Sequence, residues 1–153
     1  METTVRTQTS EVSMFKVSGI VSLALIAFFL VMKLLKLNTI VELRFLNLVI
    51  MLFGVRYILL HRRAENAGKL EYLKGMITGF FTAFIAAIFF AVFIFLYLNL
   101  DPSFMQYLQN TQPFGNYLTP ASASLLTVIE GTASGAIITF MLMHTLNKDS
   151  DAG

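Results

Sequence analysis

The sequence predicts an all-α polytopic membrane protein, a bundle of four transmembrane helices, and two observations support this. Apolar residues make up 56% of the 153-residue chain, against roughly 45–50% in soluble domains, and charged residues make up only 13%, against about 25%. The apolar residues also gather in four long runs. A soluble domain of this size buries only about 70% of the surface that its unfolded chain exposes. A bilayer would accommodate the remaining apolar surface.

The four runs are expected to cross the membrane at residues 15–36, 38–60, 73–98 and 121–146. About 20 helical residues span a hydrocarbon core about 30 Å thick. Only helices and closed barrels satisfy every backbone polar group in lipid, and a barrel would show alternating segments of about ten residues. These runs are continuous and longer, so we expect helices.

The first two spans differ in polarity. The first ends near Lys33 and Lys36, whose side chains can reach the headgroups. The second is the most polar, since it holds Glu42, Arg44, Asn47 and Arg56 and stops at a basic cluster, His61-Arg62-Arg63. We expect Glu42 to pair with Lys33 or Lys36 at the membrane interface.

The third and fourth spans flank the longest loop, residues 99–120. The third carries no charge from Gly75 to Leu98 and ends before Asp101-Pro102, a turn signal. Residues 103–109 are expected to form a short interfacial helix. Residues 1–14 and 147–153 are polar tails, expected to be loosely held, on either side of a transmembrane domain at 15–146.

The distribution of basic residues predicts the orientation. The link after the second span holds Arg62, Arg63, Lys69 and Lys74, whereas residues 99–120 hold no Lys or Arg. Cytoplasmic loops carry an excess of Lys and Arg. We therefore expect the N and C termini to be cytoplasmic and the 99–120 loop to be extracytoplasmic.

Small residues recur at every fourth position of the last two spans. The third span has Gly75, Gly79, Ala83, Ala87 and Ala91, and the fourth has Ala123, Thr127, Gly131, Gly135 and Thr139. Such stripes let two helices approach closely. They indicate packing between the two consecutive spans or, alternatively, a homo-oligomer seam or a groove for a partner.

Glu130, inside the fourth span, is the most informative single residue. A charged side chain at this depth is costly and usually faces the bundle interior. Arg44 is expected at a similar depth, with Asn47 one turn away, so we expect a Glu130–Arg44 ion pair. It would either lock two helices together or form a site coupled to a proton, ion or small solute. A water-filled defect or a different helix register remains an alternative.

No motif for catalysis, a cofactor or a metal is found. Cysteine is absent, and His61 and His144 have no ligand-like spacing. The sequence therefore predicts no enzyme activity, no cofactor and no nucleic-acid partner. The expected partners are the lipid bilayer and a second copy of the chain or another membrane protein.

One region resembles a known family. Residues 75–108, including the Tyr97-Leu98-Asn99-Leu100-Asp101-Pro102-Ser103-Phe104 exit, are similar to bacterial membrane proteins catalogued as domain of unknown function 4199. The resemblance implies about 150 residues, four helices, a small-residue-rich last helix and a place in the bacterial cytoplasmic (inner) membrane. It supplies no functional residues.

These observations favour a non-enzymatic scaffold or accessory subunit. The alternative is a small transporter or channel that uses Glu130 and Arg44 as a coupling site. Four helices without an internal repeat are few for an alternating-access transporter, and an intramembrane enzyme ranks third.

Overall fold

The computed structural model describes residues 2–35, 45–66, 71–112 and 115–151, with side chains for 11–35, 45–66, 71–112 and 115–146. Every regular element in these ranges is a helix, which confirms the all-α prediction. The elements are α1 (Glu2–Leu34), α2 (Phe45–Glu65), α3 (Tyr72–Leu100), α4 (Pro102–Thr111), the 3-10 turn η2 (Gly115–Tyr117) and α5 (Pro120–Asp151).

Four of the helices are long and apolar enough to cross a membrane. The candidate spans are Glu11–Leu34, Phe45–Glu65, Tyr72–Leu100 and Pro120–Leu146. The described part of the protein is therefore a multi-pass membrane protein by length and composition. Many of its outward-facing side chains are large and apolar, as a surface in contact with lipid requires.

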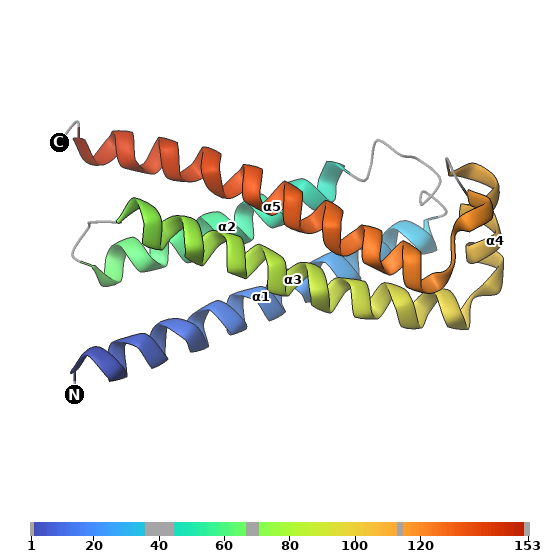
Figure 1. Ribbon diagram of the computed structural model, residues 1–153, viewed down its shortest axis with the longest axis horizontal. Helices are drawn as coiled ribbons and strands as arrows, with labels where there is room; N and C mark the ends of the chain where they lie inside the picture. The colour runs from blue at the N-terminus through green and yellow to red at the C-terminus, as the bar shows by residue number, and fades with distance from the viewer. Residues whose placement is uncertain (1, 36–44, 67–70, 113–114, 152–153) are drawn as a thin grey trace.

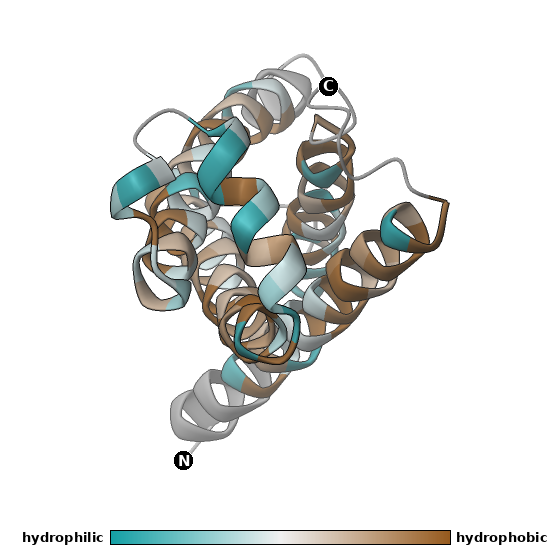
Figure 2. Ribbon diagram, turned by 90° about the vertical axis from the view of Figure 1, so that its right-hand side faces the viewer, coloured by the Kyte–Doolittle hydropathy of each residue, from teal (hydrophilic) through white to brown (hydrophobic). Residues whose placement is uncertain are grey.

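The helix α3 lies at the centre of the bundle. It packs against α1, α2 and α5, and its contact with α5 is the most extensive. Figure 1 shows the start of α1, the end of α2 and the end of α5 at one end of the bundle, and α4 at the other. Figure 2 views the bundle from the α4 end, where the polar residues of α4 lie in front of the mostly apolar long helices.

Several helices extend beyond the expected spans. Helix α1 begins at Glu2, within the stretch 1–14 expected as a polar tail, and α5 continues to Asp151. The end of α2 is Glu65 rather than residue 60, whereas residues 38–44 of the expected second span lie outside the described residues. A helix continues wherever its backbone hydrogen bonds continue, so an apolar run marks the bilayer crossing and not the helix ends.

A buried polar contact joins α1 to α3. The Ser18 hydroxyl lies within 2.8 Å of the Met14 carbonyl oxygen and within 3.0 Å of the Thr82 carbonyl oxygen. Both Ser18 and Thr82 are almost completely buried. A hydroxyl that donates across two helices satisfies a polar group that would otherwise be unpaired in hydrocarbon.

Helix α4 is held at its start by Asp101, which caps it. The Asp101 carboxylate accepts hydrogen bonds from the Phe104 N–H at 3.2 Å and the Tyr97 hydroxyl at 2.9 Å. The Lys33 ammonium, at the end of α1, pairs with the same carboxylate and lies 4.4 Å from the centre of the Tyr97 ring. Pro102 follows at the first helical position, which it favours. The expected short helix after Asp101-Pro102 is thus confirmed.

Lys33 has a partner that the sequence did not suggest, since the structure pairs it with Asp101. The expected pairing of Glu42 with Lys33 or Lys36 stays a prediction, because Lys36 and Glu42 lie outside the described residues. No sequence pattern indicated the Lys33–Asp101 pair, because the two residues are far apart in the chain and come together only when α3 packs against α1. The hydrogen bond from Lys33, and then that from Phe104, lower the pKa of the Asp101 carboxyl below its ordinary value of 3.8.

The far end of α4 is fixed by the turn η2. The Gln109 side-chain amide donates to the Leu118 carbonyl oxygen at 2.9 Å. Gly115 approaches α4 so closely that a Cβ there would lie 1.8 Å from the Gln109 carbonyl oxygen. Only glycine fits that position, so α4 is tied to α1 at its start and to the following turn at its end.

Candidate functional site

The two small-residue stripes face each other along the α3–α5 seam. A Cβ built on Gly135 would lie 2.2 Å from the Ala83 Cβ, and one on Gly131 would lie 2.8 Å from the Ala87 Cβ. Two turns along, a Cβ on Gly79 would lie 2.5 Å from the Thr139 methyl carbon. Gly75 is also buried in α3. The stripes therefore pack within one chain, the first of the alternatives that the sequence left open.

A pocket of about 600 Å³ lies beside this seam, towards the α4 end of the bundle. All four long helices contribute to its walls, and α4 lies across one end. Its volume falls within the roughly 300–1,000 Å³ of small-molecule sites.

Most of the pocket wall is apolar and rich in aromatic rings. The apolar lining residues include Leu25, Phe28, Phe29, Met32, Phe45, Leu48, Met51, Phe90, Ile94, Leu98, Phe104 and Leu108. Phe29 is the centre of an aromatic cluster, with edge-to-face contacts to Phe90, Phe93, Tyr97 and Phe104. This cluster joins α1, α3 and α4 and gives the wall a fixed shape.

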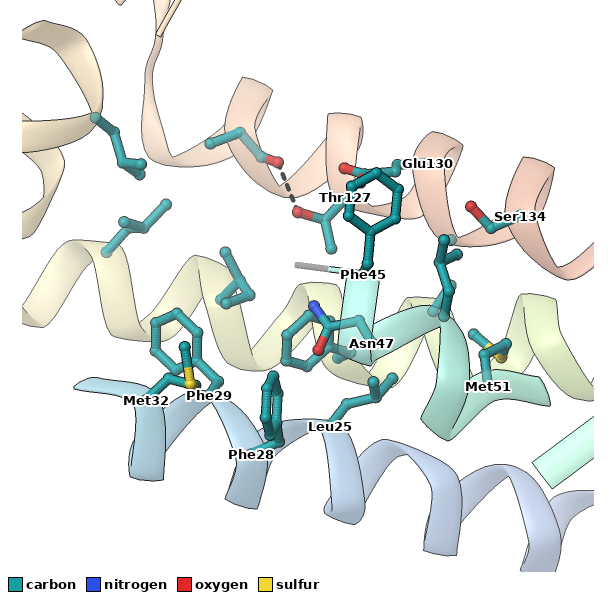
Figure 3. Close-up of a pocket in the computed structure, with 18 of the residues that line it drawn as sticks. Leu25, Phe28, Phe29, Met32, Phe45, Asn47, Met51, Thr127, Glu130 and Ser134 are labelled. Carbon is teal, nitrogen blue, oxygen red and sulfur yellow. Dashed lines mark hydrogen bonds between the residues drawn. The ribbon is translucent and has the colours of Figure 1, made fainter. Parts of the chain in front are cut away.

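The polar lining residues come from three helices. They are Asn47 on α2, Tyr107 and Thr111 on α4 with Gln112 directly after it, and Thr127, Glu130 and Ser134 on α5. Figure 3 shows Asn47, Thr127 and Glu130 around the same space as the rings of Phe28, Phe29 and Phe45. Two of the three residues expected in a polar site, Glu130 and Asn47, therefore line one pocket.

Hydrogen bonding at these polar groups is incomplete. The Thr127 hydroxyl donates to the Ala123 carbonyl oxygen at 3.0 Å, the bond drawn in Figure 3. The Asn47 Oδ1 atom is buried and accepts no hydrogen bond from the described residues. Such an atom is uncommon in a folded protein and calls for an explanation.

Glu130 lies at the border of the pocket. Its side chain lines the pocket, yet the residue is exposed on the outer side of α5, beside the exposed Ile129. It follows Pro120 by ten residues, so it lies about 15 Å along the helix from that end. Within the described parts of the chain, the ion pairs are Lys33–Asp101, His61–Glu65 and Lys74–Glu71, and none includes Glu130.

The expected partner of Glu130 lies outside the described residues. Arg44 directly precedes Phe45, which lines the pocket together with Glu130. The Glu130–Arg44 pair stays a prediction, and the position of Phe45 is compatible with it.

Sequence reasoning missed the pocket itself. Phe29, Phe90 and Phe104 carry no sequence signal that separates a pocket wall from a lipid-facing surface. Asn47 and Glu130 gave the only signal, since polar residues inside membrane spans tend to mark sites. Among the described residues, no group of three His, Asp or Glu side chains is placed to hold a metal ion. The arrangement is a pocket with an apolar, aromatic wall and polar side chains at its border.

Comparison with known proteins gives a family and no activity. Neither the search of curated proteins nor that of solved structures found a match. The sequence profile of a family described as "Protein of unknown function (DUF4199)" matches residues 16–148, which include all four candidate spans except the first residues of α1. The protein belongs to the DUF4199 family.

Proposed function

We propose that this protein is a non-enzymatic accessory or scaffold subunit, which acts by contact with another membrane protein inside the bilayer. The observation that carries the proposal is the exposed position of Glu130 on α5, among outward-facing apolar residues such as Leu126 and Ile129. A charged group in lipid at this depth costs about 2.5–3.5 kcal/mol on insertion scales. A neighbouring transmembrane helix that presents a donor at the same depth removes that cost.

The partner chemistry follows from the exposed face of α5. Its apolar residues match a second apolar helix, and the Glu130 carboxyl group matches an Arg, Lys, Ser or Asn side chain on that helix. A second copy of this chain is one such partner. The proposed location is the bacterial cytoplasmic membrane, which the family resemblance supports.

The test is native mass spectrometry of the assembly extracted in gentle detergent from its own membranes, for the wild type and Glu130→Gln. A stoichiometric complex that weakens about tenfold or more in Glu130→Gln supports the proposal. Glu71→Gln is the matched control, because Glu71 is exposed at the other end of the bundle, beside Lys74. A monomer in both preparations, or a complex that Glu130→Gln leaves unchanged, contradicts the proposal.

A double variant distinguishes an internal Glu130–Arg44 ion pair from a contact between Glu130 and a partner subunit. If the two side chains pair, Glu130→Gln lowers the thermal stability of the purified monomer, and adding Arg44→Gln restores part of it. Additive losses count against the pair. Neither outcome depends on the complex.

A transporter or channel is the second candidate, because Glu130 and Asn47 line one pocket. In that case Glu130→Gln abolishes a pH-dependent proton or solute flux into liposomes, and the variant has the same thermal unfolding curve as the wild type. A flux that is the same in Glu130→Gln and the wild type rules the coupling role out.

We also propose that both termini lie in the cytoplasm. Arg62, Arg63 and Lys74 are close to the end of the bundle where α1 begins and α5 ends, and the α4 end carries no described basic residue except Lys33. Reporter fusions at residue 153 and within residues 105–110 should report opposite sides. The same side for both, or a C terminus outside, contradicts the orientation.

A further inference from the structure

We propose that the intramembrane pocket binds a lipophilic organic amine in its protonated form, with the ammonium group between Glu130 and Asn47. The apolar body of the ligand would lie against the aromatic wall. This inference goes beyond the proposed subunit role and does not depend on it, since the pocket lies within a single chain.

Three polar groups of the pocket wall have free capacity to accept a hydrogen bond. Asn47 Oδ1 is buried and accepts no hydrogen bond from the residues that the structure describes, and Glu130 supplies two carboxylate oxygens. The Thr127 hydroxyl has already committed its proton to the Ala123 carbonyl oxygen, so its remaining capacity is to accept. A ligand that brings several N–H donors complements all three groups, and an ammonium group does so with the opposite charge to that of a carboxylate.

The aromatic rings favour the same ligand. Phe28, Phe29, Phe45 and Phe90 line the pocket, and the faces of such rings attract cations. The volume of about 600 Å³ accommodates an alkyl or aryl body of ordinary small-molecule size. A ligand without a hydrogen-bond donor would leave Asn47 Oδ1 unsatisfied, and a ligand without a positive charge would not balance the Glu130 carboxylate.

The depth of Glu130 and the described lining residues favour a free amine over a phospholipid headgroup as the ligand. An ethanolamine headgroup brings a phosphate with its ammonium, and no Lys or Arg is among the described residues that line the pocket. A second charge without a partner would be costly in this setting. Glu130 also lies about 15 Å along α5 from Pro120, away from the headgroup layer.

Access to the pocket is from the side. Because Glu130 is exposed on α5 and also lines the pocket, it stands at an opening towards the bilayer. A lipophilic amine partitions into the bilayer and can reach this opening without crossing the tied α4 helix.

The experiment is a native mass spectrometry titration of the full-length chain in detergent with decylamine, and with decan-1-ol as the uncharged match. We expect decylamine to bind about 10- to 100-fold more tightly, the gain typical of a hydrogen bond to a charged group. In Glu130→Gln, decylamine and decan-1-ol should bind with about equal affinity. In Asn47→Leu the affinity for decylamine should fall several-fold.

A pair of neighbouring variants tests whether binding occurs in the pocket. Ser134 lines the pocket, whereas Ala133 is exposed and is not among the lining residues. Ser134→Leu should abolish binding of both probes, and Ala133→Leu should leave it unchanged. These two variants keep the Glu130 carboxyl group, so a loss of binding in Ser134→Leu cannot be due to a loss of charge at residue 130.

Several results would overturn the inference. Equal affinities for the amine and the alcohol would show that the charge of the ligand does not contribute to binding. Unchanged binding in Ser134→Leu would show that the probes do not bind in the pocket. Binding that appears only in Arg44→Gln would show that the chain's own guanidinium occupies the site. Displacement of decylamine by phosphatidylethanolamine, and not by phosphatidylcholine, would assign the site to a headgroup.

Discussion

Helix α5 packs tightly against α3 on one part of its surface and borders an open pocket on the adjoining part. Along the seam with α3, Gly131 and Gly135 bring the helices so close that a Cβ on either glycine would overlap an alanine Cβ. The pocket of about 600 Å³ begins at the edge of this seam, where Gly131 belongs to its lining, and continues a short way around the same helix at Glu130 and Ser134. The difference shows how a small membrane domain gains rigidity at one surface and can leave a binding space at the next.

The two surfaces differ in what their side chains do. Small residues at the seam give van der Waals contact between backbones, the main source of helix association in lipid. The pocket side has polar groups whose hydrogen bonds are incomplete, which suits recognition better than stability. The seam is therefore expected to be sensitive to side-chain volume, and the pocket to side-chain chemistry.

The largest expected effect comes from filling the seam. Gly135→Leu places a large side chain where even a Cβ would lie 2.2 Å from Ala83 Cβ. Overpacking typically costs about 1–3 kcal/mol and occasionally more. Thermal unfolding in detergent, followed by circular dichroism, should show a clear loss of stability. Ala133→Leu, on the exposed side, is the control and should be close to the wild type; equal losses would mean that the seam is not the sensitive surface.

A smaller effect is expected at the end of the pocket, where Asp101 ties α4. The pKa of its carboxyl is lowered in the folded protein, mainly by the hydrogen bond from Lys33. The resulting stabilisation is full above the unfolded-state value of about 3.8 and disappears as the pH falls through the lower folded-state value. The protection of the α4 amides against hydrogen exchange, measured relative to the intrinsic exchange rate at each pH, should therefore fall in that acid range.

The matching variant is Asp101→Asn, which should accelerate exchange in α4 at neutral pH and leave little further change on acidification. Glu65→Gln, beside His61 at the other end of the bundle, should not affect α4. If neither the Asp101→Asn variant nor the pH changed the protection of α4, the contact between Gly115 and Gln109 alone would account for the stability of this helix.

The smallest effect is expected at the α1–α3 contact. Ser18→Ala removes the hydrogen bond to the Thr82 carbonyl oxygen. Hydrogen bonds between membrane helices average about 0.6 kcal/mol, so the loss should be well below that of Gly135→Leu in the same unfolding assay. A larger loss for Ser18→Ala would reverse the ranking of the two contacts.

Much of the fold could be predicted from the sequence, because bilayer thickness and backbone hydrogen bonding leave little choice for long apolar runs. The stripes that contain Gly79, Gly131 and Gly135 also carried their information locally, at a four-residue spacing. The Lys33–Asp101 pair could not be found this way, since it joins residues far apart in the chain. The pocket was equally hidden, because an absence of side-chain volume between Phe29, Asn47 and Glu130 depends on how five helices pack.

The most direct test of this contrast is the reactivity of single cysteines on the two sides of α5. The chain has no cysteine, so Ser134→Cys and Thr139→Cys need no altered background. Ser134 lines the pocket, whereas Thr139 is fully buried in the seam. Each variant is treated in detergent with a small, membrane-permeant organomercurial and its intact mass is followed over time. We expect rapid modification at residue 134 and almost none at residue 139; equal rates, or faster reaction at residue 139, would contradict the account.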